Sequence, residues 1–229
     1  DSGKVVFQGK ELSDLVIKEP PAQYPQCGSD EVGTGDYFGP IVVCATLVTE
    51  DNVTKLHQLG VGDSKGINDK VIRNIAPELI ELLPHSIGLL TPEKYNEVSK
   101  KNNLNRIKAL MHNQCYLNLE KKVGELPALR VIDQFTPEKK YYYYLGTETQ
   151  IVKGIHFETK AENAYLCVGA ASIIARYAFL KTFDQYREKY YFPFPKGAGT
   201  KVDEFGKQFI KEYGVKEFKK KKKINFKNT

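Results

Sequence analysis

The pattern of apolar and polar positions alternates between strand-like and helix-like stretches. Short runs of apolar and β-branched residues predict strands; these are residues 26–31, 41–49, 85–90, 129–133 and 151–157. Between them, apolar residues recur every three or four positions, which predicts helices. The expected helices are residues 51–59, 70–83, 92–101, 104–122, 137–145, 161–190 and 202–213. A hairpin first and alternating helices later indicate a mixed sheet flanked by helices.

Several of these helices have a local reason to begin or end where they do. Thr91, Asn103 and Thr136 precede expected helices and are suitable N-caps, because their side-chain oxygens accept hydrogen bonds from free N–H groups. Pro137 suits a first helical position, and Pro84 ends the helix before it.

Length and composition indicate one large folded domain. The chain has 229 residues, of which 41% are hydrophobic, enough to bury a substantial core. Its cysteines have no metal-ligand spacing, and free thiols fit a reducing cytosol. No apolar run approaches the ~18 residues of a membrane span, and the N-terminus lacks the apolar core of a signal peptide. We therefore expect a soluble, cytoplasmic monomer with no membrane partner and no small-molecule organic cofactor.

The net charge of +6 comes from one end of the chain. Residues 216–229 contain seven lysines and one acid, and removing these from the totals of 34 basic and 28 acidic residues leaves 27 of each. Such a basic run could contact phosphates, or it could be a solvated, frayed tail. Charge alone favours neither.

Four acids lie where strands end or a helix begins. Asp30 and Glu31 end the first strand beside a glycine-rich turn, Asp133 ends the fourth, and Glu162 lies near the start of helix 161–190. Gathered carboxylates repel one another unless a cation shares the site, and Mg²⁺ prefers carboxylate oxygens, water and phosphate. Two such ions ~3.5–4 Å apart support phosphodiester cleavage. Each acid alone is better explained as a cap or surface charge, and only the pair beside the turn favours a site.

A longer motif gives this pair a context. The segment GSDEVGTGDYFGP (residues 28–40) resembles the opening motif of ribonuclease HIII, the bacterial branch of the type 2 ribonucleases H. Further similar stretches follow in the family's order: DSK (63–65), HNQC (112–115), VIDQF (131–135), TKAEN (159–163), AASIIAR (170–176), PKGAG (195–199) and INFKNT (224–229). The resemblance extends from Tyr24 to the C-terminus.

The resemblance implies an α/β ribonuclease H-like fold, with a central mixed β-sheet flanked by α-helices. It also implies endonucleolytic hydrolysis of the RNA strand of RNA/DNA hybrids, giving 5′-phosphate and 3′-hydroxyl ends. The family's catalytic, metal-binding acids fall on Asp30, Glu31, Asp133 and Glu162. Mg²⁺ is the expected cofactor, with Mn²⁺ as a substitute, and the hybrid is the expected partner.

The same resemblance implies a set of nucleic-acid contacts. Backbone at a glycine-x-glycine motif would read 2′-hydroxyl groups, which distinguish RNA from DNA, and the other residues would contact the substrate. The set is Gly33, Thr34, Gly35, Ser64, Lys65, Ser172, Arg176 and Lys196. The glycines could instead serve a turn with positive φ, and Ser172 could simply allow close helix packing.

Other candidates have simpler explanations. His112 and His156 lie in no diagnostic pattern, so we expect structural roles for both. The tyrosine run at 141–144 could stack on bases, but a helical run turns part of its rings inward, which favours packing.

We expect two parts: residues 1–23, a remnant of an N-terminal substrate-binding domain with its linker, and residues 24–229, the catalytic domain with its basic tail. Two rival functions remain. One is cleavage at a single ribonucleotide in duplex DNA, as in ribonuclease HII, although Gly33-Thr34-Gly35 lacks that branch's basic middle residue. The other is a catalytically silent hybrid-binding module, which the complete set of four acids argues against.

Overall fold

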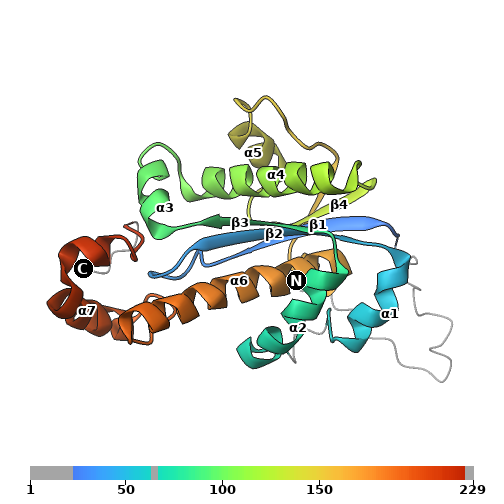
Figure 1. Ribbon diagram of the computed structural model, residues 1–229. Helices are drawn as coiled ribbons and strands as arrows, with labels where there is room; N and C mark the ends of the chain where they lie inside the picture. The colour runs from blue at the N-terminus through green and yellow to red at the C-terminus, as the bar shows by residue number, and fades with distance from the viewer. Residues whose placement is uncertain (1–22, 63–66, 225–229) are drawn as a thin grey trace, which may run out of the picture.

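A single mixed sheet organises the molecule. The computed structural model describes residues 23–62 and 67–224. Within them, β1 (Gln26–Val32), β2 (Ile41–Val48), β3 (His85–Leu90), β4 (Leu129–Asp133) and β5 (Ile155–Glu158) form a five-stranded sheet in the order β3-β2-β1-β4-β5 (Figure 1). The pairs β1–β2 and β2–β3 are antiparallel, and β1–β4 and β4–β5 are parallel. The ends of β1 and β4 therefore lie side by side at the centre of the sheet.

Helices cover both faces of this sheet. On one side lie α3 (Pro92–Val98), α4 (Leu104–Val123) and α5 (Glu138–Tyr144); on the other lie α1 (Glu50–Gln58), α2 (Asp69–Leu82) and α6 (Leu166–Tyr190) (Figure 1). The last helix, α7 (Thr200–Lys219), packs at the end of the sheet where the described chain finishes. The predicted ribonuclease H-like layering of a mixed sheet between helices is confirmed.

The long helix α6 fits closely against the centre of the sheet. A Cβ added to Gly28 of β1 would lie 2.6 Å from the Cys167 sulfur, so this strand approaches α6 only because it carries a glycine. Among the described residues, α6 is the one helix long and apolar enough to cross a membrane, with 67% of that window buried. Its apolar character is that of a core helix.

Most predicted elements are confirmed, including residues 85–90 and 129–133 with unchanged bounds. The side chains of Thr91 and Asn103 cap α3 and α4 as expected. Pro137, however, is the N-cap of α5 rather than its first helical residue. All four cysteines are free and buried: Cys27, Cys44, Cys115 and Cys167.

The prediction of one helix over residues 161–190 was wrong in its first turn. Residues Ala161–Asn163 form a separate 3₁₀ helix, η1, and α6 begins only at Leu166. Tyr165 between them is extended, and its hydroxyl donates to Glu158 at 3.0 Å. Glu162 therefore lies on η1 and not on the long helix.

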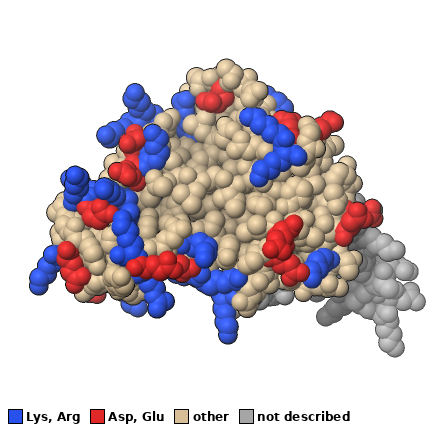
Figure 2. All heavy atoms as spheres, viewed as in Figure 1, with Lys and Arg blue, Asp and Glu red and all other residues tan. Residues whose placement is uncertain are grey.

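The idea of a frayed basic tail was also wrong as far as residue 224. Helix α7 continues through a kink at Gly214 to Lys219, and Lys223 is 1% exposed. Figure 2 shows Lys and Arg side chains gathered mainly around the α7 end of the visible face, while the centre is mostly uncharged. Residues 216–224 of the basic run are thus part of the fold.

The tyrosine run packs as expected, with Tyr141 fully buried and Tyr143 81% exposed. The predicted N-terminal remnant lies, except for residue 23, outside the described residues.

Candidate active site

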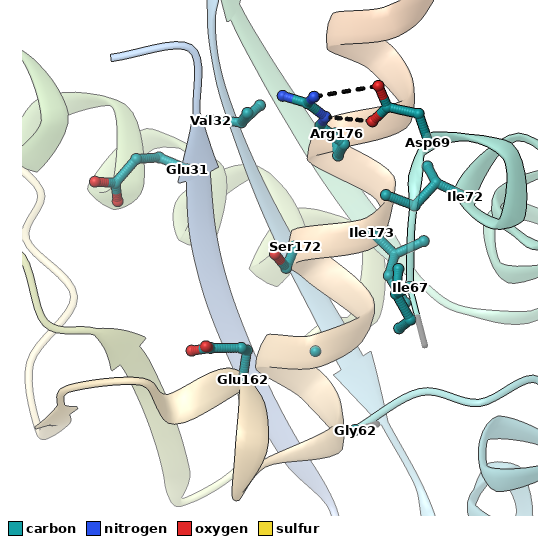
Figure 3. A pocket seen from close by; sticks show the side chains of 11 residues that line it. Glu31, Val32, Gly62, Ile67, Asp69, Ile72, Glu162, Ser172, Ile173 and Arg176 are labelled. Atoms are coloured by element: carbon teal, nitrogen blue, oxygen red, sulfur yellow. Dashed lines mark hydrogen bonds and ion pairs between the residues drawn. The ribbon is translucent and has the colours of Figure 1, made fainter. Parts of the chain in front are cut away.

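Asp30 and Glu31 sit near the end of β1 and face opposite sides of the sheet. Successive residues of a strand point to opposite faces, and these two follow that rule. Asp30 turns toward α6, where the Ser172 hydroxyl hydrogen-bonds to it. Glu31 turns toward α4, where its carboxylate meets two basic side chains. Figure 3 shows Glu31 extending from β1 away from the helix that carries Ser172.

Asp30 is a buried carboxyl group among other acids. It is 8% exposed, and the Glu31 backbone N–H donates to its Oδ1 at 2.6 Å. Burial raises the pKa of Asp30 to about 7, and the charges of Glu31 and Asp133 add to this rise against the hydrogen bond from Ser172. A positive charge at this point would therefore stabilise the ionised form.

Glu31 is held by a network that reaches into α4. Lys108 Nζ lies 2.7 Å from Glu31 Oε1, and His112 Nε2 lies 2.9 Å from Oε2. The other nitrogen of His112 lies 2.7 Å from the Ser29 hydroxyl. Burial works against ionisation of Glu31, but the hydrogen bonds and charges of His112 and Lys108 lower its pKa. Glu31 is thus an oriented carboxylate.

Asp133 and Glu162 approach from β4 and η1. Asp133 Oδ1 accepts the Ala161 N–H at 3.1 Å, which ties the end of β4 to the start of η1. Glu162 Oε1 accepts from the Asn163 side chain at 3.3 Å, whereas its Oε2 is buried with no hydrogen-bond partner. Leaving a buried carboxylate oxygen unpaired is unfavourable, so Glu162 Oε2 is an acceptor available to a ligand.

The four acids do not form a closed ligand set. Across residues 23–62 and 67–224, no three His, Cys, Asp or Glu side chains are grouped so as to hold a metal ion. Glu31 is one reason why the set is not closed, because Lys108 and His112 hold its carboxylate toward α4.

A pocket of about 390 Å³ opens between β1, α2, η1 and α6. Glu31 and Glu162 line it together with Ser172, Arg176 and Asp69. Arg176 Nε lies 2.9 Å from Asp69 Oδ1, an ion pair drawn dashed in Figure 3, and Lys196 also pairs with Asp69. The pocket therefore has Glu162 at one end and Arg176 at the other, where Asp69 pairs with both Arg176 and Lys196.

The loop between β1 and β2, residues 33–40, is called the glycine loop below. Gly33 has φ +89°, and an added Cβ would lie 2.1 Å from the Pro40 carbonyl oxygen, so the turn itself requires glycine there. At Gly35, which is exposed, an added Cβ would meet nothing within 4 Å. Gly33 is thus needed for the turn itself, whereas Gly35 is open to solvent and could serve a backbone contact.

Comparison with known proteins shows the family to which this chain belongs. The family model described as Ribonuclease HII matches residues 27–229. A ribonuclease HIII of Listeria monocytogenes is 44% identical over 205 residues, covering 88% of this chain and 67% of that protein. The chain belongs to the ribonuclease HIII family. A Bacillus cereus ribonuclease HIII is 40% identical over 255 residues, covering 100% of this chain and 82% of the relative.

Solved structures agree with this assignment. Bst-RNase HIII in complex with Mn²⁺ superimposes with a TM-score of 0.86 at 39% identity, covering 90% of this chain and 68% of that one. Aquifex aeolicus RNase H3 gives a TM-score of 0.70 at 28% identity, covering 88% and 72%. The fold is therefore that of ribonuclease HIII, and the chain is a ribonuclease of the H type.

In this ribonuclease HIII, the predicted site residues that the structure describes, apart from Glu31 and Gly33 treated above, fall into three groups. Asp30, Ser172, Asp133 and Glu162 lie near one another through the contacts above, and Arg176 and Lys196 meet on Asp69. Thr34 and Gly35 lie on the glycine loop, with Thr34 half-buried. Ser64 and Lys65 lie outside the described residues.

Sequence reasoning missed three residues of this ribonuclease HIII site. Asp69, the first residue of α2, links the two predicted phosphate contacts. Lys108 and His112 hold Glu31, although His112 was expected to be only structural and Lys108 was not considered. Their spacing of four residues placed them on one face of a helix, which was the available signal.

Proposed function

We propose that this chain hydrolyses the RNA strand of RNA/DNA hybrids with the help of a divalent cation, giving 5′-phosphate and 3′-hydroxyl ends. The observation that carries the proposal is the buried Asp30, next to Asp133 and Glu31, on the strand that leads into the loop with the exposed Gly35. A relative solved with Mn²⁺ supports the cation.

The residues present fit a bound cation. Burial and neighbouring acids raise the pKa of Asp30 to about 7, and Glu162 Oε2 is buried without a partner. Both features are relieved by positive charge. We propose that Asp30, Asp133 and Glu162 hold the cation, and that Glu31 joins them when its carboxylate turns from Lys108 and His112. When bound, Mg²⁺ or Mn²⁺ activates water and stabilises the leaving oxygen.

The remaining residues bind and orient. Lys108 and His112 lower the pKa of Glu31 and so keep its carboxylate ionised. Arg176 and Lys196 offer cations for backbone phosphates at the other end of the pocket. Gly35, with open space at its Cβ position, allows the loop backbone to approach 2′-hydroxyl groups.

The decisive experiment compares matched substrates with Mg²⁺, Mn²⁺ or chelator. A continuous RNA/DNA hybrid should be cut with either metal, and not with chelator. Asp133→Asn should lower the cleavage rate at least about a hundredfold while hybrid binding stays nearly unchanged. Asp184→Asn is the control, because Asp184 pairs with Arg73 on the surface and does not line the pocket of the candidate site.

Other outcomes point to the rivals. Efficient cleavage only at a single ribonucleotide in duplex DNA would indicate the ribonuclease HII type of specificity. Hybrid binding without cleavage under any metal would indicate a silent binding module. Metal-independent cutting, or full activity of Asp133→Asn, would contradict the mechanism.

A further inference from the structure

Lys223 is buried although it belongs to the most basic run of the chain. It is 1% exposed, and its Nζ donates to the carbonyl oxygens of Gly39 at 2.5 Å and Phe38 at 3.3 Å. Burial lowers the pKa of Lys223 to about 7, with the charge of Asp36 opposing the shift. A lysine is almost never fully buried without partners, and here the partners are backbone atoms of the glycine loop.

The backbone around Lys223 makes the same connection. Residues 220–224, called the C-terminal segment below, run antiparallel to the glycine loop through a bridge between Phe38 and Lys222. The Lys223 N–H donates to the Tyr37 carbonyl at 2.9 Å, and the Gly39 N–H donates to the Lys221 carbonyl at 3.4 Å. The loop thus gains backbone partners beyond β1 and β2.

Asn96 of α3 holds the C-terminal segment from the other side. Its side chain donates to the Lys222 carbonyl at 2.9 Å and accepts from the Ile224 N–H at 3.0 Å. The segment is therefore fixed between α3 and the glycine loop and is not free to follow a nucleic-acid backbone as a tail.

The glycine loop is also tied to residues 195–199, which include a predicted phosphate contact. Asp36 Oδ1 accepts the Gly197 N–H at 2.6 Å, and the Tyr37 N–H donates to the Gly197 carbonyl at 2.9 Å. Displacing the glycine loop would move the neighbour of Lys196 as well.

We propose that Lys223 is a positioning residue, which sets the position of the glycine loop so that its backbone can recognise the RNA strand. Lys223 acts through Phe38 and Gly39 and does not touch the substrate. The inference rests on the proposed function, because it assigns the lysine to that function's substrate-reading loop. It differs from the phosphate-contact reading of the basic run, in which each lysine contributes by its charge.

The test compares Lys223→Met with Lys220→Met in the full chain. Both changes remove one amino group from the same segment, but Lys220 is 39% exposed and pairs with Glu217. In an Asp133→Asn background, affinities for an RNA/DNA hybrid and for an all-DNA duplex of the same sequence are measured at two salt concentrations. In the active enzyme, KM and kcat are measured on the hybrid.

Lys223→Met should weaken hybrid binding by about tenfold, since a displaced contact group loses its geometry, while duplex DNA binding changes little. KM should rise with kcat nearly unchanged, and the salt dependence of binding should stay as in the wild type. Lys220→Met should keep the hybrid-to-DNA affinity ratio of the wild type. Asn96→Ala should reduce that ratio in the same direction, and it decides the matter if Lys223→Met does not fold.

An unchanged ratio in folded Lys223→Met, or an equal loss in Lys220→Met, would overturn the inference. Failure of the proposed function would give a different result, because the wild-type chain would then not cut the hybrid at all.

Discussion

At the scale of single residues, Asp30 carries a pH-dependent contribution to stability. Its pKa is raised to about 7 in the metal-free fold, against an unfolded value near 4. Between those pH values the folded state binds more protons than the unfolded state, so the free energy of unfolding falls as pH rises through this window. Asp30→Asn should therefore raise the stability of the metal-free protein above pH 7, by up to roughly 4 kcal/mol.

Thermal unfolding in chelator at pH 4 and pH 8 measures this difference. The variant and the wild type should differ at pH 8 and converge at pH 4. Added Mg²⁺ should stabilise the wild type more than the variant, with Asp184→Asn behaving as wild type. Lower stability of Asp30→Asn at pH 8 would contradict the conclusion that the ionised Asp30 carboxylate destabilises the metal-free fold.

Gly33 and Gly35 should respond oppositely to the same substitution. Gly33→Ala places a methyl group against the Pro40 carbonyl at positive φ, so it should destabilise the fold by about 1–3 kcal/mol. Gly35→Ala meets no neighbour and should leave the melting temperature unchanged while weakening hybrid binding. Calorimetry and a binding titration on both variants separate the two effects. Normal hybrid binding by Gly35→Ala would remove this glycine from the substrate contacts.

The residue-scale prediction from sequence was strongest where the motif was local. The pair Asp30-Glu31 and its strand end followed from one continuous stretch of chain. The partners of Glu31 did not, because Lys108 comes 77 residues later and reaches it only through the packing of α4 on the sheet. Periodicity indicates which residues share a face, but not what the opposite surface holds there.

At the scale of elements, Asp69 joins α2, α6 and the loop before α7. Asp69→Asn removes the ion pairs to Arg176 and Lys196, which are partly exposed, so the loss of stability should be no more than about 1 kcal/mol. The same change releases two cations toward phosphates and should tighten hybrid binding at low salt. It should also steepen the salt dependence.

Chemical denaturation tests the expected loss of stability, and binding titrations at several salt concentrations test the expected gain in hybrid affinity. Arg73 pairs with Asp184 between α2 and α6, so Asp184→Asn provides an ion-pair control away from the pocket. Weaker hybrid binding by Asp69→Asn at low salt would show that the acid orients its cations more than it masks them.

Element boundaries were predicted well where local sequence decides them and poorly where tertiary contacts do. The N-caps Thr91 and Asn103 act within their own helices. By contrast, strand β5 is shorter than predicted, because the Asn113 side chain of α4 pairs with the backbone of Gln150 and Val152. The expected long helix breaks at Tyr165, which is extended and whose hydroxyl donates to Glu158 of β5. Neither partner is visible in a local pattern.

At the scale of the whole molecule, the sheet order assembles the candidate site from distant stretches. Asp30 on β1 and Asp133 on β4 become neighbours because these strands pair in parallel. The layered fold followed from the order of strands and helices in the sequence. The burial of Phe218 and Lys223 did not follow from the sequence, because a run of lysines has the pattern of a solvated charge cluster.

The contact between Lys223 and the glycine loop also bears on how the protein is made. Lys223 follows Phe38 by 185 residues, and a ribosome adding about 5–20 residues per second needs roughly 10–40 s to cover that interval. Until then the loop lacks the partner that closes it. Completion of this loop is therefore a late event in the synthesis of residues 23–224, because it waits until Lys223 has been added and can reach Phe38 and Gly39.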